Sequence, residues 1–353
     1  MELLVLEGDG IGPEITAATL GVLNAASARF GFTLAFRHER IGLAALEHDG
    51  STFPGAVLAA ARAADGVILG PVSHNDYPIG MPNPSGMLRR NLDLYANIRP
   101  ARTRPGLPPR AGIPLDLVIV RENTEGFYAD RTMFMGTGEF MPTPDLAMAM
   151  RKVTRAGSTR IAEAAFALAT RRRSRVTAVH KANVLRVSDG LFLECVRDVA
   201  TRYPGVALEE QLVDSMTALL IRDPSVYDVI VTTNMFGDIL SDEASELSGS
   251  LGLAASLNSG SDHAVAQAQH GSAPSIAGQD IANPASLIGS AAMLLAWLGE
   301  RRNEPAPLHA AAAIQAALDL VVARPETRTR DLGGTLGTAG FAAEVVAALG
   351  GSA

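Results

Sequence analysis

The sequence predicts an α/β fold. Short apolar runs typical of buried strands alternate with longer segments of helical periodicity along much of the chain. The composition, with 47% hydrophobic and 19% charged residues, is that of a globular protein and not of a disordered one. The 353 residues are enough for one large domain, or for two modest domains that share a core.

The first elements follow from apolar runs and the turn residues between them. Two strands and two helices are expected here: strands at 3–6 and 66–69, and helices at 13–30 and 54–64. Pro13 suits the first turn of a helix, because a first-turn amide has no partner within the helix. Residues 70–87 are rich in Pro, Gly, Asn and Ser and predict a long loop, a feature that is often functional.

The rest of the chain continues this alternation and then becomes helical. Strands are expected at 91–98, 115–120, 176–179, 207–213 and 229–231, and helices at 154–173, from 237 onward, and at 284–302, 305–322 and 338–349. The longest apolar stretch, residues 287–298, is too short to cross a bilayer. We therefore expect it to be a buried core or interface helix.

Charge and cysteine content exclude several classes of function. The formal net charge of -7 gives no electrostatic reason to bind nucleic acid or an anionic membrane. The single cysteine, Cys195, forms no intrachain disulfide, and its apolar helical surroundings favour a buried residue over a nucleophile. Residues 1–6 lack the basic segment of a signal peptide. We expect a cytoplasmic protein with no nucleic-acid and no membrane partner.

Two aspartates form the clearest candidate metal site. Asp238 and Asp242 lie four residues apart, so on a helix they project from the same face. Two close carboxylates repel one another unless a cation lies between them, and oxygen ligands suit Mg²⁺ or Mn²⁺. Asp214, near the end of the strand-like run at 207–213, is a possible third ligand. The alternative is an exposed acidic helix start, since acidic residues favour first turns.

Three arginines near predicted strand ends are candidates for binding carboxylates. Arg89 and Arg99 flank the run at 91–98, and Arg121 follows the run at 115–120. A guanidinium group binds a carboxylate in a two-pronged geometry. Three that converge would suit a substrate with two or three carboxylates, whereas a surface salt bridge is the alternative for any one of them.

Lys181 and Tyr128 are candidate acid–base groups. Lys181 follows the strand at 176–179. Beside a metal and several arginines its pKa would be lowered, so that it could act as a base. Tyr128 lies seven residues past Arg121 and could donate a proton. For each residue a structural or solvated role is the alternative.

Two glycine-rich segments could approach a nucleotide. The run GDGIG at 8–12 lies between a strand and a helix, but its spacing is not GxGxxG. No suitable acidic residue follows about 20 positions later to hold a ribose, so we reject a standard Rossmann site. The run HGSAPSIAG at 270–278 is a loop of small residues ahead of a helix, where backbone N–H groups can approach a phosphate or a flat ring.

Together these segments resemble the isocitrate/isopropylmalate dehydrogenase family. Its members are β-decarboxylating dehydrogenases that act on isocitrate, homoisocitrate, 3-isopropylmalate, tartrate or D-malate. The resemblance spans nearly the whole chain, from Gly8 to Gly334. It rests on the runs GDGIGPE at 8–14, LDLYANIRP at 92–100, RENTEG at 121–126 and HKANVL at 180–185, and on residues 234–243, 270–284 and 331–334.

The resemblance implies a two-domain fold with a central mixed sheet that is not a Rossmann fold. A large cofactor-binding domain would combine residues 1–97 with 250–353. Residues 98–249 would form a small domain that binds substrate and metal and makes the contact of a homodimer. The active site would lie in the cleft between the domains, with Lys181 and Asp214 reaching in from the other copy of the chain.

The resemblance also implies roles for individual residues. Arg89, Arg99 and Arg121 would bind the carboxylates of a malate, and Asp214, Asp238 and Asp242 would hold Mg²⁺ or Mn²⁺ against its C1 carboxylate and 2-hydroxyl group. With Lys181 assisting removal of the hydroxyl proton, hydride would leave C2 for the nicotinamide. The resulting β-keto acid would lose CO₂, and Tyr128 would help to protonate C3. The cofactor would lie against a further set of residues: Ile11, Asn183, His270, Gly271, Ser272, Ala273, Ser275, Ile276, Asn283 and Asp331.

Two departures from the family pattern concern the cofactor. Ser275 stands where NAD-preferring members usually carry an acidic residue, and Ser275-Ile276 stands where NADP-preferring members often carry Lys-Tyr. Neither Ser275 nor Ile276 is a basic residue that could bind the 2′-phosphate of NADP. We therefore expect NAD as the cofactor, with NADP as the alternative. The run QAQ at 267–269 replaces the usual Glu-Pro-Val, so a carboxylate near the nicotinamide ribose is missing.

A third departure favours a polar substrate. Isopropylmalate enzymes place two leucines where Ser85 and Gly86 stand here, whereas isocitrate enzymes place Ser and Asn close to Asn83 and Ser85. Burying a branched alkyl group against Ser and Gly would forfeit about 1–3 kcal/mol of apolar contact. His180 also favours a polar substrate, because isopropylmalate enzymes tend to carry Asp at this position. We expect isocitrate or homoisocitrate, then tartrate or D-malate, with 3-isopropylmalate as the alternative.

Two other classes of protein compete with this reading. A non-catalytic regulatory subunit of an isocitrate dehydrogenase would usually have lost metal or arginine residues, and this chain keeps them all. Dehydrogenases of the hydroxythreonine-phosphate type use histidine-rich metal sites, whereas the candidate ligands here are aspartates.

Overall fold

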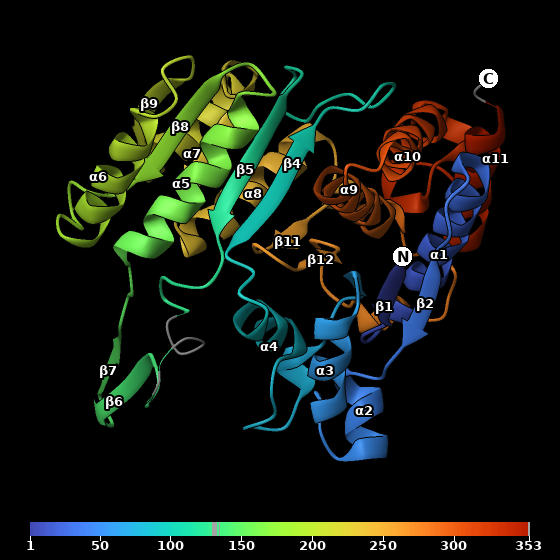
Figure 1. Cartoon of the computed structure of the whole chain (residues 1–353), viewed down its shortest axis with the longest axis horizontal. Coiled ribbons are helices and arrows are strands. Elements are labelled where there is room, and N and C mark those ends of the chain that lie inside the picture. The colour runs from blue at the N-terminus through green and yellow to red at the C-terminus, as the bar shows by residue number, and fades with distance from the viewer. Residues whose placement is uncertain (129–132, 134, 352–353) are drawn as a thin grey trace.

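One ten-stranded sheet runs through the computed structural model, which describes residues 1–128, 133 and 135–351 (Figure 1). Its strand order is β2-β1-β3-β12-β11-β4-β5-β10-β8-β9. The strands are β1 (Glu2–Leu6), β2 (Ala35–His38), β3 (Gly66–Leu69), β4 (Ala96–Arg102), β5 (Asp116–Glu122), β8 (Arg175–His180), β9 (Ala207–Leu212), β10 (Val229–Thr232), β11 (Leu257–Ser259) and β12 (Ala264–Gln267). The α/β class is therefore confirmed.

The sheet is mixed, as the resemblance implied. Its two outer parts are parallel, whereas β11 and β4 run antiparallel to their neighbours at the centre. In the central pair Ile98 of β4 lies opposite Leu257 of β11. Main-chain pairing thus crosses the proposed boundary between residues 1–97 plus 250–353 and residues 98–249, so the two parts share one sheet.

Eleven helices of the described chain cover the sheet in two groups (Figure 1). They are α1 (Gly12–Phe30), α2 (Gly42–Asp49), α3 (Gly55–Ala63), α4 (Pro84–Asn91), α5 (Arg155–Ala169), α6 (Ser188–Ala200), α7 (Val213–Arg222), α8 (Asn234–Ser248), α9 (Ala285–Arg302), α10 (Pro305–Ala323) and α11 (Thr338–Gly351). Around the first strands, α1, α9, α10 and α11 pack together, and α3 and α4 enclose a second apolar cluster.

The second group encloses the other half of the sheet. Val118 and Val120 of β5 point into a cluster with α5 and α6, and the alternate residues Leu117 and Ile119 point into a cluster with α7 and α8. This is the two-residue period of a strand covered on both faces. Because α8 packs against β4 and β5, it holds Asp238 over these two strands.

Several predicted boundaries were wrong. Residues 70–87 do not all form a loop: α4 begins at Pro84, because the Asn83 side chain accepts hydrogen bonds from the N–H groups of Ser85 and Gly86 at 3.0 and 3.3 Å. The predicted strand at 91–98 begins only at Ala96, so Arg99 lies within β4 and not after it.

A third boundary concerns residues 207–213, where the strand ends at Leu212 and α7 begins at Val213. Asp214 therefore lies in the first turn of a helix. The helix expected from residue 237 already begins at Asn234. Elements without a strong apolar period, such as β2, α2 and the short β11, were not predicted at all.

Two apolar helices lie in the core. Residues 287–298 form part of α9 and are largely buried, which confirms the expectation of a core helix. Of the helices in the described part of the chain, α10 alone is long and apolar enough to cross a membrane by length and composition. Its residues Ala310, Ile314 and Leu318 are fully buried in the cluster with α1, α9 and α11, as expected of a core helix. Cys195 is buried in α6, as predicted.

A hairpin of β6 (Glu139–Thr143) and β7 (Leu146–Ala149) extends away from the main body (Figure 1). The side chains of Phe140, Met141 and Met148 are all exposed. Exposed apolar side chains on a projecting hairpin are typical of a surface that another chain covers.

Candidate active site

A cleft of about 290 Å³ gathers most of the residues proposed to bind substrate. The residues that line the cleft come from several separate parts of the chain. The cleft is lined by Asn83, the N-cap of α4, Ser85 and Arg89 of α4, Arg99 of β4, Arg121 of β5, Tyr128, Asp238 of α8, and residues 267–271 at and beyond the end of β12. The structure therefore brings together all three predicted arginines and one of the predicted metal ligands.

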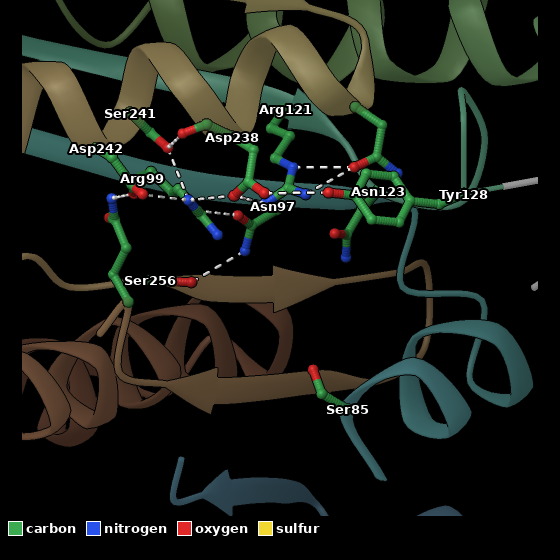
Figure 2. Close-up of polar contacts among 12 residues, drawn as sticks. Ser85, Asn97, Arg99, Arg121, Asn123, Tyr128, Asp238, Ser241, Asp242 and Ser256 are labelled. Carbon is green, nitrogen blue, oxygen red and sulfur yellow. Dashed lines mark hydrogen bonds and ion pairs between the residues drawn. The ribbon is translucent and has the colours of Figure 1, made fainter. Parts of the chain in front are cut away.

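Arg99 and Arg121 meet on the carboxylate of Asp238 (Figure 2). Arg121 donates through Nη1 to Asp238 Oδ1 at 2.5 Å, and its Nε and Nη2 donate to Asn234 Oδ1 at 3.0 and 2.8 Å. Arg99 donates through Nη1 to the same Asp238 oxygen at 3.1 Å and to Ser241 Oγ at 2.7 Å. With only 2% and 6% of their surface exposed, Arg121 and Arg99 are held in fixed geometry.

Gly237 allows α8 to approach this close. A Cβ atom at position 237 would lie 2.7 Å from Arg121 Cγ and 2.8 Å from its Cβ. The side chain of Arg121 passes under the first turns of α8, and any residue larger than glycine would push the helix away. The sequence showed Gly237 next to Asp238, but not the reason for it.

The pKa values of Arg99 and Asp238 are both lowered in this cluster, for different reasons. Burial and the neighbouring Arg121 lower the pKa of Arg99 to about 10. Burial alone would raise the pKa of Asp238, but Arg121, Arg99 and Arg89 outweigh it and hold this pKa below its ordinary value. Asp238 is therefore an anion that balances the charge of these arginines.

A network of buried amides supports the arginines from below. Asn97 Nδ2 donates to Ser256 Oγ and to Asn258 Oδ1, both at 2.9 Å, and Asn97 Oδ1 accepts a short hydrogen bond from Arg99 Nε. Asn123 Nδ2 donates to the same Asn258 oxygen at 3.0 Å. These residues were not predicted as part of the site. The only available signal was an asparagine within an apolar strand.

Asp238 and Asp242 fit a divalent cation in part. They lie one helical turn apart on the face of α8 that meets the arginines, and Asp242 Oδ1 is 3.5 Å from Arg99 Nη1 (Figure 2). Asp242 Oδ2 has no hydrogen-bond partner within the described ranges, and the side chain is 57% exposed. Carboxylate oxygens suit Mg²⁺ or Mn²⁺. Within those same ranges, however, no group of three acidic, histidine or cysteine residues surrounds one point.

Lys181 and Asp214 lie outside the cleft. Lys181 Nζ and Asp214 Oδ1 are 2.6 Å apart, and this hydrogen bond lowers the pKa of the Asp214 carboxyl. Neither residue lines the cleft of the same chain. Asn183, predicted to contact the cofactor, is exposed beside them, as are Val184 and Val187, which are 67% and 88% exposed.

Tyr128 lies over the arginine–aspartate cluster. Its hydroxyl donates to Asp238 Oδ2 at 3.3 Å, and Arg121 Cζ lies 5.8 Å from the centre of its ring (Figure 2). The Tyr128 hydroxyl therefore shares the Asp238 carboxylate with the arginines. Tyr128 is also one of the residues that line the cleft.

The wall of the cleft beside α4 is polar. Ser85 Oγ donates to Gln267 Oε1 at 3.1 Å. Asn83 lines the cleft as well, but its Oδ1 is used as the cap of α4. His74, which begins the short 3-10 helix His74–Asp76, also lines the cleft and was not predicted, because no recognisable sequence pattern surrounds it.

A second pocket, of about 260 Å³, adjoins the cleft at His270 and Gly271. Seven of the predicted cofactor residues line it: Ile11, His270, Gly271, Ala273, Ile276, Asn283 and Asp331. Asn283 Nδ2 donates to Asp331 Oδ2 at 3.0 Å. Burial lowers the pKa of His270, whose Nδ1 donates to Gly271 O at 2.9 Å while its Nε2 is buried without a partner among the described residues.

The loop around Ser272 is joined to two others. Ile11 N donates to Ser272 O at 2.8 Å, and a Cβ at Gly10 (φ 59°) would lie 2.0 Å from that oxygen, so glycine is required there. Ser272 Oγ and Ser73 Oγ are 2.7 Å apart. Ser272 thus anchors the pocket from below. Ser275, in contrast, is exposed and does not line it.

Comparison with known proteins identifies the family. The family model described as isocitrate/isopropylmalate dehydrogenase matches residues 2–347. The chain belongs to this family. It is 40% identical over 346 residues to the 3-isopropylmalate dehydrogenase of Methanothermobacter thermautotrophicus, covering 98% of this chain and 97% of the relative. It is 41% identical over 349 residues to the isocitrate/homoisocitrate dehydrogenase of Thermus thermophilus, covering 98% of each.

A solved structure agrees with the fold. The isocitrate dehydrogenase from Methylococcus capsulatus superimposes with a TM-score of 0.87 at 38% identity, covering 99% of each chain. The recognition of the isocitrate/isopropylmalate dehydrogenase family from its segments is thereby confirmed, as is its oxidoreductase class. Members of the family are oxidative decarboxylating dehydrogenases of hydroxy acids that use a nicotinamide cofactor and a divalent metal. Relatives of nearly equal identity carry the names of different substrates, so the substrate has to be argued from the cleft.

Proposed function

We propose that this member of the family oxidises and decarboxylates a (2R)-malate with a polar substituent at C3, using NAD and Mg²⁺ or Mn²⁺. The observation that carries the proposal is the meeting of two buried arginines on one carboxylate beside a polar wall. Arg99 and Arg121 are rigid and charged, so they are preorganised for a carboxylate of the substrate. NADP is the alternative cofactor.

Substrate binding would proceed by an exchange of partners. The carboxylates of the malate would take the place of the Asp238 carboxylate beside Arg99, Arg121 and Arg89. Asp238 and Asp242 would then be free to hold the cation. This exchange avoids leaving a buried guanidinium group without an anion. When bound, the cation supplies Lewis acidity that lowers the pKa of the 2-hydroxyl group and stabilises the enolate.

The chain's own residues would move the protons. Lys181, supplied by the other copy, would take the proton of the 2-hydroxyl group while hydride passes to the nicotinamide of NAD. Tyr128 would return a proton to C3 after loss of CO₂, since its hydroxyl lies at the edge of the cleft beside Asp238. NAD would lie in the pocket between Ile11 and Asp331, with Ser272 below it and Ser275 and Ile276 near its adenosine end.

The substituent at C3 would meet Asn83, Ser85 and Gln267. An isopropyl group would displace water from their hydroxyl and carboxamide groups. Because it cannot form hydrogen bonds itself, the lost hydrogen bonds to water would not be replaced. Isocitrate or homoisocitrate is therefore favoured, followed by tartrate or D-malate. 3-Isopropylmalate is the alternative.

The active unit would be a cytoplasmic homodimer with two shared sites. Three features support it: the exposed β6–β7 hairpin, the exposed Val184 and Val187, and the Lys181–Asp214 pair that stands apart from the cleft of its own chain. The contact would lie in the small domain, residues 98–249, and the cofactor in the large domain, residues 1–97 plus 250–353.

The test is formation of reduced cofactor with each candidate substrate. The purified protein would be assayed with Mn²⁺ and each of five substrates: isocitrate, homoisocitrate, 3-isopropylmalate, D-malate and tartrate. Each substrate would be tested with NAD and with NADP. We expect the highest kcat/KM for a polar substrate with NAD. A higher kcat/KM for 3-isopropylmalate than for every polar analogue would contradict the proposed substrate. If no reduced cofactor formed with any of these substrates, the result would favour a non-catalytic regulatory subunit.

A further inference from the structure

One side chain reaches across the cleft from the cofactor side to the metal side. Gln269 follows β12, and its main-chain N–H donates to Ser286 Oγ at 3.3 Å at the start of α9. Its Nε2 donates to Asp242 Oδ1 at 2.7 Å and to Ser245 Oγ at 3.3 Å, both on α8. Gln269 belongs to the proposed large domain and α8 to the proposed small one, so this contact joins the two parts.

The orientation of the Gln269 amide is decided by Asp242. A carboxylate only accepts hydrogen bonds, so Nε2 and not Oε1 has to face it. The cost is visible at the other end of the amide, because Gln269 Oε1 is buried and has no hydrogen-bond partner among the described residues. A buried acceptor without a donor is disfavoured, so the contact with Asp242 outweighs this loss.

Asp242 depends on this contact for its position. The Asp242 side chain is 57% exposed, and its remaining charged neighbour, Arg99, is 3.5 Å away and bonded mainly to Asp238 and Ser241. The amide of Gln269 therefore fixes the direction of the carboxylate and leaves Oδ2 for a cation.

Gln269 is also the residue directly before the cofactor pocket. His270, the next residue, lines that pocket. A ligand that orders the backbone at His270 would also order Gln269, and through its amide the Asp242 carboxylate. We propose that Gln269 is a positioning residue that couples binding of the nicotinamide cofactor to binding of a divalent cation at Asp242. The inference rests on the proposed function, since it assumes both ligands.

The coupling has a measurable signature. If cofactor binding helps to position Asp242, then the cofactor tightens cation binding, and the cation tightens cofactor binding by the same factor. A residue with only a structural role would weaken both ligands without changing this ratio. The ratio, and not either affinity alone, is therefore the quantity to measure.

The experiment is a binding cycle on the full-length protein without substrate. The dissociation constant of Mn²⁺ is measured with and without saturating NADH or NADPH, whichever binds the wild type, and that of the cofactor with and without Mn²⁺. Gln269→Met removes the amide at similar length, and Gln269→Asn keeps the amide but shortens its reach. Gln315→Met is the matched control, because Gln315 also bridges two elements, bonding Arg104 and Gly289, but lies away from both pockets.

In the wild type and in Gln315→Met we expect each ligand to tighten the other about fivefold or more. In both Gln269 variants this factor should fall to near unity, and the Mn²⁺ affinity without cofactor should fall about tenfold, as for a lost hydrogen bond to a charged group. Coupling that persists in Gln269→Met, or that is absent from a wild type able to bind both ligands, overturns the inference. A wild type that binds neither Mn²⁺ nor a nicotinamide cofactor overturns the proposed function itself.

Discussion

Arg121 and Asp238 form an ion pair at 2.5 Å in which the guanidinium is almost fully buried and the carboxylate is partly open to the cleft. The pair is thus anchored on one side and accessible on the other. In an arrangement of this kind the buried partner is fixed in the scaffold, and the accessible partner is the one that ligands can displace. It makes Asp238 a structural counter-ion as well as a candidate metal ligand, whereas Asp242, at 57% exposure and 3.5 Å from Arg99, is a candidate metal ligand with weaker ties to the arginines.

Asp238→Asn should therefore lower the free energy of unfolding, by about 1–3 kcal/mol, because it leaves Arg99 and Arg121 without their anion. We place the effect below that of a fully buried pair, since the Asp238 side chain is 37% exposed. Urea denaturation without metal measures it. Asp242→Asn is the matched control and should change stability by less than about 0.5 kcal/mol, while both variants weaken Mn²⁺ binding. Equal losses of stability would contradict the division of roles.

His270 should make stability depend on pH. Burial lowers its pKa below the ordinary value of 6.5, so near and below that pH the unfolded chain binds a proton that the folded chain does not. The stabilisation is complete above pH 6.5 and is lost as the pH falls through the lowered pKa of the folded state. His270→Asn should show a shallower fall in unfolding free energy over this range.

The matched control for this prediction is His309→Asn, on the exposed face of α10. It should leave the slope of the wild type unchanged. His180, whose pKa burial also lowers, contributes in the same direction, so the His270 variant should keep part of the slope. Identical slopes in the wild type and in His270→Asn would show that His270 does not remain neutral in the folded protein.

The sequence predicted those parts of the site that depend on local spacing. Asp238 and Asp242 share a face because a helix turns every 3.6 residues, a rule that needs no tertiary information. Arg89, Arg99 and Arg121 were predicted as a set because they lie near predicted strand ends, although Arg99 in fact lies within β4. The burial of Arg99 and Arg121 and their shared contact with Asp238 follow from the pairing of β4 with β5, which the pattern did not show.

What was missed depends on residues far apart in the chain. Gln269 bonds a residue 27 positions away, and Asn97 bonds Ser256 at a separation of 159. No pattern within a sequence window of ordinary length predicts either contact. The start of α4 was missed for a different reason: Asn83 and Pro84 are a cap and a first-turn proline, but they stand in a run of Pro, Gly, Asn and Ser that is typical of loops.

Tyr128→Phe should slow decarboxylation and reprotonation more than hydride transfer. The phenol is the proposed acid at C3, and loss of a positioned acid costs about a hundredfold or more in rate. Free β-keto acid should therefore accumulate relative to CO₂ when both products are measured in one turnover. Tyr203→Phe, which packs on Phe166 away from the cleft, is the control and should leave the product ratio unchanged. An unchanged ratio in Tyr128→Phe would remove Tyr128 from the proton step.

Lys181 should act only on the site of the other copy. Lys181→Met and Asp242→Asn should each be inactive alone, because every site of either homodimer lacks one group. In a heterodimer of the two variants, one site combines an intact Asp242 with an intact Lys181 from the opposite chain, and the second site lacks both. Co-refolding an equal mixture should restore about a quarter of wild-type activity, since random pairing makes half of the dimers mixed and each of these has one intact site of two. Each variant refolded alone provides the baseline.

If Lys181 served the cleft of its own chain, no pairing could bring the two groups together and the mixture would stay at that baseline. The separation of the Lys181–Asp214 pair from the cleft of its own chain favours recovery.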